Sequence, residues 1–285
     1  MKKILMTLCV LSPTLMFPQD QDKTAYLALQ GDTLMFALES HQCTGKIEVF
    51  GKTYECTSGY RLIIGVDVAQ KPGTYPVTRK VFYDNTPQEE IVRTIQVQER
   101  HFPEKQMKPP RFSPVKNRDL EIIEINVALT EGERKYFFQN FSSLFVAPLD
   151  AITVTDEFGT KRSYTVWQKK KPVLVTSPPH RGVDLRADSG TPVRAAGNGI
   201  VVCASRFSLE GNMVIVYHGS GVYSLYMHLK EFKVHHGESV SLGKIIALSD
   251  NTGASAGPHL HFAVKIKGAN VDPLYFLRKL GAKVD

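Results

Sequence analysis

The sequence lacks several patterns that identify a protein class at once. It contains no short internal repeat, no low-complexity tract and no glycine-rich phosphate loop, so neither a repeat architecture nor a phosphate-loop nucleotide site is indicated. After the first 17 residues, no apolar run is long enough to span a bilayer. We therefore expect a globular mature chain without a membrane span.

The first residues, MKKILMTLCVLSPTLMF, join a basic head to an apolar segment that is too short for a membrane span. This pattern is typical of a secretory signal. We predict that residues 1–18 are removed on export and that the protein is periplasmic, envelope-associated or secreted. No pair of small residues marks a cleavage site before Gln19, which leaves an uncleaved anchor as the alternative.

Charge and composition narrow the choice of partner. Apolar residues make up 42% of the sequence and charged residues 22%, as in ordinary globular proteins, and 285 residues favour two domains. The net charge is +7, which in an exported protein suits an anionic wall polymer better than a nucleic acid. The alternative is a basic surface that only keeps the protein soluble.

Residues 19–102 are predicted to form a β-sandwich, because short alternating apolar runs are separated there by turn residues. In the run EEIVRTIQVQE, this alternation places three apolar residues on one buried face, namely Ile91, Ile95 and Val97. Cys43 and Cys56 flank a hairpin sequence. We expect the two thiols to lie opposite each other, where an oxidising compartment would permit a disulfide.

Residues 103–143 are expected to join two domains. Four prolines in FPEKQMKPPRFSPVK indicate an extended connector. Apolar residues then recur at helical intervals, namely at Leu120, Ile123 and Val127, and predict a short helical bridge that Gly132 interrupts. Strand-like runs return over residues 144–285 and predict a second β-domain, with a short helix after Pro273. The predicted fold class is therefore all-β.

Histidines are concentrated near the C-terminus, where seven of the nine follow residue 179. Two of them stand one residue apart in the strand-like run GPHLHFAV. Because side chains two apart on a strand point to the same side, His259 and His261 face one cleft while Leu260 and Phe262 face the interior. Two imidazoles held on one strand form half of a metal site, since neutral nitrogen donors suit zinc.

The stretch PPHRGVDLRADSG offers the missing ligands. It contains His180 and Asp184, and Gly182 between them is expected to let the backbone bend so that both side chains converge. Its prolines and glycine argue against the helical H-E-x-x-H pattern of zincins. One zinc ion held by two histidines and one aspartate keeps a position open for water, as catalytic sites do, and lowers the pKa of that water toward about 7.

Attack by this water also needs a proton acceptor and a group that stabilises the developing oxyanion. The stretch LYMHL supplies His228 on another strand, so His228 and His259 are the candidates for these two roles. Asn212, Tyr223 and Tyr226 are candidates for substrate contact. The alternatives are turn formation for the asparagine and sheet packing for the tyrosines.

Five blocks together resemble the lysostaphin and LytM type of zinc metallopeptidase, whose members hydrolyse peptide bonds in peptidoglycan: HRGVD, GTPVRAAGNGIV, GNMVIVYHG, YSLYMHL and TGASAGPHLHF. The resemblance covers about residues 158–276, and DEFGTKR, residues 156–162, is similar to the Phe-Gly start of that domain. It implies a groove on an antiparallel sheet of the duplicated hybrid motif type, zinc ligands at His180, Asp184 and His261, and a catalytic pair at His228 and His259. More weakly, KPGTYPV and FPEKQM resemble the immunoglobulin-like domain that accompanies some of these peptidases.

The sequence thus predicts an exported zinc endopeptidase, monomeric by default, that cleaves peptide stems or cross-links of peptidoglycan. The alternative is a non-catalytic relative that binds the wall or activates a partner hydrolase. Such relatives usually lack a metal ligand, and this chain lacks none. A third reading is latency, in which the N-terminal domain or residues 117–141 cover the groove until they are displaced. A fragment starting near Ala147 would then cleave faster than the full mature chain.

Overall fold

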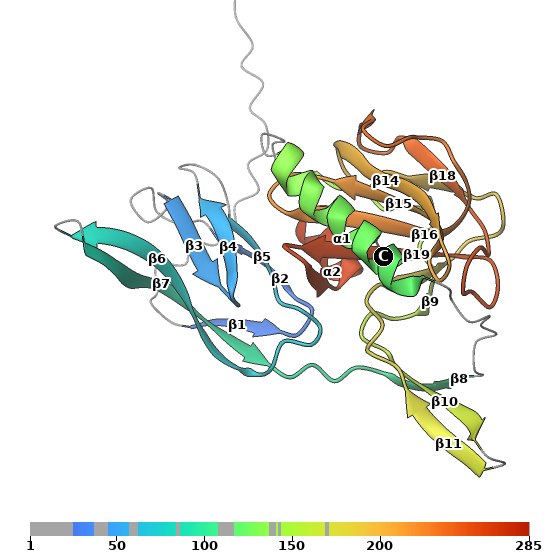
Figure 1. The fold of residues 1–285 in the computed structure, drawn as a ribbon, viewed down its shortest axis with the longest axis horizontal. Coiled ribbons are helices and arrows are strands. Elements are labelled where there is room, and N and C mark those ends of the chain that lie inside the picture. Colours follow the sequence, from blue (N-terminus) through green and yellow to red (C-terminus); the bar gives the residue numbers. More distant parts are fainter. Residues whose placement is uncertain are drawn as a thin grey trace, which may run out of the picture.

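The structure is a computed structural model that describes residues 25–36, 45–56, 62–83, 86–107, 117–136, 141, 144–168 and 171–284. The predicted signal segment, residues 1–18, lies outside this part of the chain. Strands dominate the described residues, which contain two helices, and this confirms the all-β prediction (Figure 1). Neither of these helices combines the length and the apolar character needed to cross a membrane.

The N-terminal part forms two small sheets around a shared core. The larger has the order β1-β7-β6-β3-β4, with strands at Tyr26–Leu29, Thr86–Gln98, Gly73–Tyr83, Gly45–Val49 and Lys52–Cys56. The smaller pairs β2 (Thr33–Phe36) with β5 (Leu62–Gly65). Inward side chains of both sheets are almost fully buried, among them Phe36, Ile47, Ile64 and Ile95. The immunoglobulin-like assignment of residues 19–102 stays a prediction.

One of the predicted core residues of this part lies on the surface. The ladder between β6 and β7 skips Val92, because the rung at Arg93 is followed by one at Ile91. An extra residue in one strand reverses the alternation of its side chains. Ile91 is therefore 63% exposed, whereas Ile95 is buried.

The β3–β4 hairpin has a different register from the expected one. Its two central residues, Phe50 and Gly51, both have positive φ, which is typical of a two-residue hairpin turn. This turn fixes the register, so that Gly45 lies opposite Cys56. In this ladder the partner of Cys56 is Gly45, whereas Cys43, which was predicted to lie opposite Cys56, falls outside the described residues.

Part of the predicted connector is a strand. β8 (Glu104–Met107) pairs in parallel with β10 (Lys161–Gln168), which forms a hairpin with β11 (Lys171–Thr176). Figure 1 shows this three-stranded sheet projecting away from the large C-terminal sheet. The connector is thus integrated with the C-terminal half through β10.

The C-terminal half is built on a ten-stranded sheet. Seven of its strands follow the order β17-β14-β15-β16-β19-β12-β9, while β13, β18 and β20 pair off this path. The bounds are Val154–Asp156 (β9), Val183–Arg186 (β12), Pro192–Arg194 (β13), Gly199–Phe207 (β14), Gly211–Tyr217 (β15), Val222–Phe232 (β16), Ser239–Val240 (β17), Ile245–Ser249 (β18), His259–Ile266 (β19) and Ala269–Val271 (β20). Helix α2 (Pro273–Lys279) follows, and the Asp272 carboxylate caps it by accepting from two backbone N–H groups.

Helix α1 (Arg118–Lys135) packs on one face of this sheet (Figure 1). Its small residues Ala128 and Gly132 are buried there, and a Cβ added at Gly132 would stand 2.7 Å from the hydroxyl oxygen of Tyr223. The helix continues through Gly132 because glycine permits this close approach. The apolar residues whose spacing predicted the helix are exposed, namely Leu120, Ile123 and Val127. A helix is present where the sequence predicted one, but the prediction that Gly132 interrupts it is wrong.

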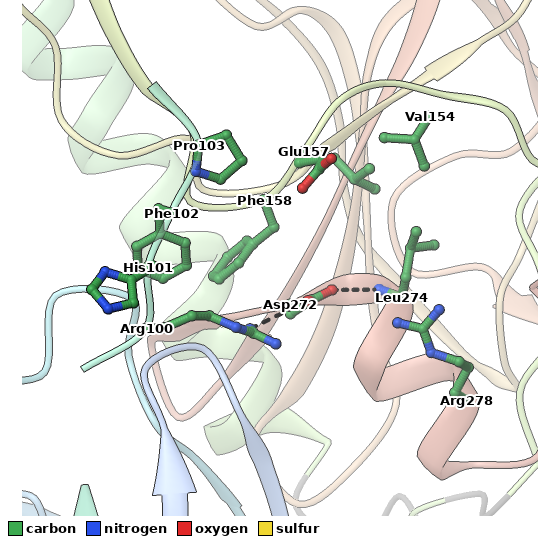
Figure 2. A pocket seen from close by; sticks show the side chains of 11 residues that line it. Arg100, His101, Phe102, Pro103, Val154, Glu157, Phe158, Asp272, Leu274 and Arg278 are labelled. Carbon is green, nitrogen blue, oxygen red and sulfur yellow. Dashed lines mark hydrogen bonds and ion pairs between the residues drawn. The ribbon is translucent and has the colours of Figure 1, made fainter. Parts of the chain in front are cut away.

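The N-terminal part packs against the C-terminal half near the start of α2. Arg100 donates to the Asp272 carboxylate at 3.3 Å, and the rings of Phe102 and Phe158 meet edge to face with centroids 6.0 Å apart. A cavity of 290 Å³ opens between these residues, as Figure 2 shows. One apolar cluster contains buried residues of both halves. The two parts therefore share a continuous core.

Candidate metal centre

Strand pairing brings the central histidines and Asp184 together. In the antiparallel ladder of β12 and β19, Asp184 lies opposite His261. Residues opposite each other point to the same face, and so do residues two apart, which adds His259 to this group. His180 precedes β12, and its backbone N–H donates to the carbonyl of Thr160 at 3.1 Å.

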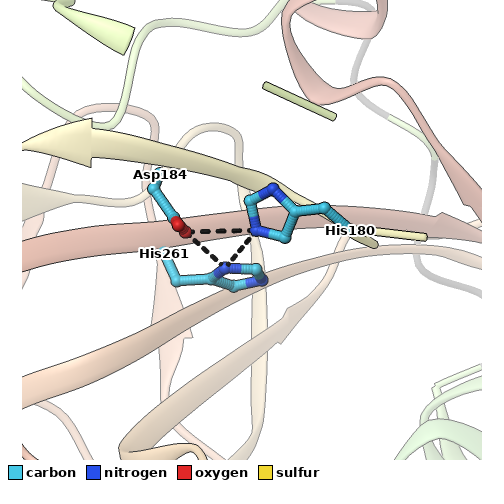
Figure 3. A group of neighbouring side chains, drawn as sticks. All are labelled: His180, Asp184 and His261. Carbon is cyan, nitrogen blue, oxygen red and sulfur yellow. Dashed lines mark hydrogen bonds and ion pairs between the residues drawn. The ribbon is translucent and has the colours of Figure 1, made fainter. Parts of the chain in front are cut away.

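Three side chains converge on one point, as Figure 3 shows. The Asp184 Oδ1 atom lies 2.8 Å from Nδ1 of His261 and 3.2 Å from Nε2 of His180. The same two nitrogen atoms are 3.1 Å apart. One donor atom from each of the three residues lies within 4.8 Å of the others. Two nitrogens and one carboxylate oxygen so arranged form a donor set that suits zinc.

Hydrogen bonds and burial set the protonation of this group. Nδ1 of His180 donates to the carbonyl of Glu157 at 2.8 Å, which leaves the Nε2 lone pair facing the cluster. Burial alone would raise the pKa of Asp184, but the close contacts with the imidazoles of His180 and His261 hold it far below its ordinary value. Burial lowers the pKa of His261, although the Asp184 carboxylate opposes this shift. The carboxylate is thus ionised at neutral pH.

A second pair of histidines lies beside the first group. The ring centroids of His228 and His259 are 4.8 Å apart, and Nε2 of His259 is 3.6 Å from Asp184 Oδ1. Nδ1 of His228 donates to the carbonyl of Thr252 at 2.7 Å, and Nδ1 of His259 donates to that of Gly257 at 2.9 Å. Both rings therefore keep Nε2 as the atom that can exchange a proton.

His228 holds an unusual backbone conformation. Its φ of 61° lies in the left-handed region, which costs a residue other than glycine about 1–3 kcal/mol. Its backbone N–H donates to the carbonyl of Glu210 at 2.9 Å, and its position coincides with a register shift between β15 and β16. Burial, followed by repulsion from His261 and His259, lowers the pKa of His228 to about 4. The imidazole is therefore neutral at pH 7.

The backbone bends at Gly182, as expected, although the residue does not have a positive φ. Glycine is needed there for close approach as well. A Cβ at this position would stand 2.6 Å from Nε2 of His261 and 2.6 Å from the carbonyl oxygen of Phe262. The absence of a side chain lets the segment between His180 and Asp184 pass directly beside the His261 ring.

The residues predicted to contact substrate make hydrogen bonds within the protein, and their substrate role stays a prediction. The Asn212 side chain donates to the carbonyls of Leu229 and Lys230, both at 3.0 Å, and so supports the strand that follows His228. Tyr223 is buried beneath α1, where its hydroxyl donates to the carbonyl of Leu129. Tyr226 is also buried, and its hydroxyl accepts from Ser224 and from a backbone N–H. These contacts correspond to sheet packing, the alternative given for the tyrosines.

Several groups that orient the site could not be found from the sequence. Three carbonyls hold the imidazoles, those of Glu157, Thr252 and Gly257, and any residue type supplies a carbonyl. Arg162 was also missed. Its guanidinium donates to Asp184 at 2.9 Å, and DEFGTKR, in which it stands, indicated no role for it.

Helix α1 lies on the continuation of the face that carries the histidines. Ala263, two residues after His261 on β19, is buried in one apolar cluster with Ala128 of the helix. At the start of the helix, Arg118 makes two hydrogen bonds to the Glu210 carboxylate, at 2.8 and 2.7 Å. The helix therefore borders the site, and the expectation of latency stays a prediction.

An antiparallel sheet that carries two histidines and a carboxylate around one point, with two further histidines alongside, has the composition of a metallohydrolase site. Residues 178–273 match the model of a family described as Peptidase family M23. This match confirms the resemblance drawn from the motifs of the C-terminal half.

Two curated relatives and one solved structure extend this comparison. The chain is 33% identical over 163 residues to the peptidoglycan DD-endopeptidase ShyA of Vibrio cholerae, covering 55% of this chain and 35% of that protein. It is 36% identical over 129 residues to the DD-carboxypeptidase/endopeptidase Mpg of Neisseria meningitidis, covering 45% and 28%. It thus spans about a third of the length of the curated relatives it matches. A putative peptidase M23 from Pseudomonas aeruginosa shares the fold with a TM-score of 0.57, at 22% identity and with coverage of 87% of this chain and 94% of that one.

Proposed function

We propose that this protein is a zinc-dependent endopeptidase that hydrolyses peptide bonds in the stems or cross-links of bacterial peptidoglycan. The observation that carries the proposal is the convergence of His180, Asp184 and His261 on one point. The names of the two curated relatives support the choice of peptidoglycan as the substrate.

The donor set fits one zinc ion per chain. His180 and His261 would contribute nitrogens, and Asp184, ionised at neutral pH, would contribute one oxygen. Three protein donors are the number found in catalytic zinc sites, whereas structural sites use four. When bound, zinc supplies a Lewis acid that polarises a carbonyl oxygen and lowers the pKa of water.

His228 and His259 are proposed to move the proton that the reaction releases. Each donates from Nδ1 to a backbone carbonyl, so each can accept a proton at Nε2 and return it to the leaving amine. The low pKa of His228, about 4, keeps its Nε2 unprotonated before the reaction. The fixed carbonyl partners also hold both rings in place during this transfer.

The rival proposal is a non-catalytic relative that binds the wall or activates another hydrolase. It is disfavoured by the complete donor set and by the second histidine pair beside it. We further propose that the protein acts as an exported monomer in the cell envelope. In this proposal residues 19–102 form an immunoglobulin-like N-terminal domain, whose core is continuous with that of the C-terminal half, and residues 144–285 carry the peptidase.

The test is digestion of purified sacculi by the zinc-loaded protein, with mass spectrometry of the released fragments. We expect muropeptides cut at one type of peptide bond, and no products with His261→Ala. His235→Ala is the matched control, because that side chain is 81% exposed and pairs with Glu238, which is outside the metal cluster. Failure of the wild type on several wall types, or equal activity of His261→Ala, would overturn the proposal.

A further inference from the structure

Arg162, on β10, lies between two carboxylates at the edge of the metal centre. Its Nε donates to Asp156 Oδ2 at 2.8 Å, and its Nη2 lies 2.6 Å from the same oxygen. The same Nη2 is 2.9 Å from Oδ2 of Asp184. The arginine and both aspartates are largely shielded from solvent, with exposed side-chain fractions of 22, 9 and 15%.

The two oxygens of Asp184 consequently have different partners. Oδ1 faces His180 and His261, at 3.2 and 2.8 Å, whereas Oδ2 is held by Arg162. A charge-assisted hydrogen bond of this kind fixes the rotation of the carboxylate. Only one oxygen is then free to serve as a metal donor, which keeps the number of protein donors at three.

Arg162 also occupies the second carboxylate. Asp156 and Asp184 are opposite each other in the ladder of β9 and β12, so both point to the same face. Without a cation between them, they would repel each other, and Asp156 would be available as an additional donor. The bonds from Arg162 to Asp156 prevent this, and the Asp156 charge in turn offsets that of the guanidinium.

We propose that Arg162 is a positioning residue that keeps Asp184 a single-oxygen ligand and withholds Asp156 from the metal. This inference rests on the proposed metal site. Arginine is suited to the role because its planar group reaches two carboxylates at once, whereas a lysine ammonium offers one point charge. Arg162 also accepts from Ser177 through its backbone carbonyl at 2.9 Å, which fixes the base of the β10–β11 hairpin.

The experiment compares Arg162→Met and Arg162→Lys with the wild-type full chain. The zinc affinity of each protein is measured by competition with a chromogenic chelator, and the cobalt-substituted proteins are compared by visible absorption, which reports coordination number. Arg162→Met is expected to lose about 10- to 100-fold in zinc affinity, the usual effect of removing a partner of a metal ligand. We expect its cobalt spectrum to shift toward higher coordination, and Arg162→Lys to lie between it and the wild type.

Arg194→Met is the matched control. Arg194 also binds an aspartate through two nitrogens, Asp150 at 2.9 and 3.3 Å, but that aspartate is 75% exposed and the pair is outside the cluster. Its zinc affinity should stay within about 2-fold of the wild type, since a surface ion pair contributes little. If Arg162→Met does not fold, Asp156→Asn is used in its place. Loss of the Asp156 charge frees the Arg162 guanidinium to compete with zinc for Asp184, so this variant should also bind zinc more weakly.

The inference is overturned if the variants at Arg162 and Asp156 bind zinc within about 2-fold of the wild type and give the same cobalt spectrum. A 2-fold difference is well below the effect of about 10- to 100-fold that removing a partner of a metal ligand usually has. It is also overturned if the wild type binds no zinc. If the wild type binds zinc but does not cleave sacculi, only the proposed function is refuted. The zinc affinities of the wild type and the Arg162 variants can still be compared, and this comparison decides the role of Arg162. If Arg162→Met binds zinc as tightly as the wild type and still cleaves sacculi, only the positioning role of Arg162 is refuted.

Discussion

The tightest contact of the metal centre predicts the effect of Gly182→Ala. The new Cβ would stand 2.6 Å from Nε2 of His261, 2.8 Å from its Cε1 and 2.6 Å from the carbonyl oxygen of Phe262. Ordinary contact begins at 3.4 Å, so the neighbours must retreat by the difference, about 0.8 Å. The Phe262 carbonyl belongs to the central strand β19, so relief requires a shift of the backbone there or at residue 182 in addition to a movement of the His261 imidazole.

This displacement is large on the scale of a metal site. Metal–ligand distances are held to within about 0.2 Å, so the shift is about four times the tolerance. We expect zinc affinity to fall about 10- to 100-fold and overpacking to lower the free energy of unfolding by about 1–3 kcal/mol. Both quantities can be measured on the full chain, by chelator competition and by urea unfolding followed by circular dichroism.

Gly257→Ala is the matched control from the same site. Gly257 supplies the carbonyl that holds His259, yet a Cβ there would meet nothing within 4 Å and its φ is not positive. We expect its zinc affinity and stability to match the wild type. If Gly182→Ala binds zinc as tightly as Gly257→Ala does, the argument from close approach at His261 is refuted.

Three further predictions concern groups around the centre and in the core. His228→Gln should reduce sacculus cleavage at least about 100-fold while zinc binding persists, because its ring is not among the converging donors; loss of zinc would contradict its assignment to proton transfer. Tyr226→Phe removes buried hydrogen bonds to Ser224 and to the N–H of Ala196, so the free energy of unfolding should fall by about 1–3 kcal/mol with cleavage unchanged; a cleavage defect at full zinc occupancy would revive the substrate role. Burial lowers the pKa of His218 to about 4 from 6.5, so the unfolded state binds a proton first as pH falls. The free energy of unfolding of the wild type should therefore fall by up to about 3 kcal/mol as the pH is lowered from 6.5 to about 4. The urea midpoint of His218→Gln should fall less steeply with pH over this range than that of the wild type. Equal slopes for the two proteins would count against the lowered pKa of His218.

The convergence of the central residues was predictable because it follows from local rules. Two-residue alternation on β19 places His259 and His261 on one face, and the antiparallel partner strand brings Asp184 opposite His261. Residue types that bind metals made the pattern visible in the sequence. His228 was named as well, although the left-handed backbone that aims it at its neighbours was not expected.

Other features depend on contacts between distant segments and could not be read from a local pattern. The buried face of α1 is made of Ala128 and Gly132, because small residues allow close packing on Tyr223, whereas the apolar residues whose spacing predicted the helix are exposed. Similarly, one skipped residue at Val92 reverses the alternation of β7. Both features depend on how distant segments pack, and no particular residue type marks them, so they cannot be recognised from the sequence.

The position of α1 matters to anyone who shortens this protein. A fragment that starts near Ala147 would lack the helix and would uncover the apolar side chains beneath it, among them Met213, Ile215, Tyr223 and Leu225. An uncovered patch of this kind promotes aggregation. Slow cleavage by the fragment would then reflect loss of folded protein, and it would not show whether the N-terminal segments inhibit the full chain. Truncations should therefore begin upstream of Asn117, and release of a restrained groove is better tested by loosening Arg118 in the intact chain.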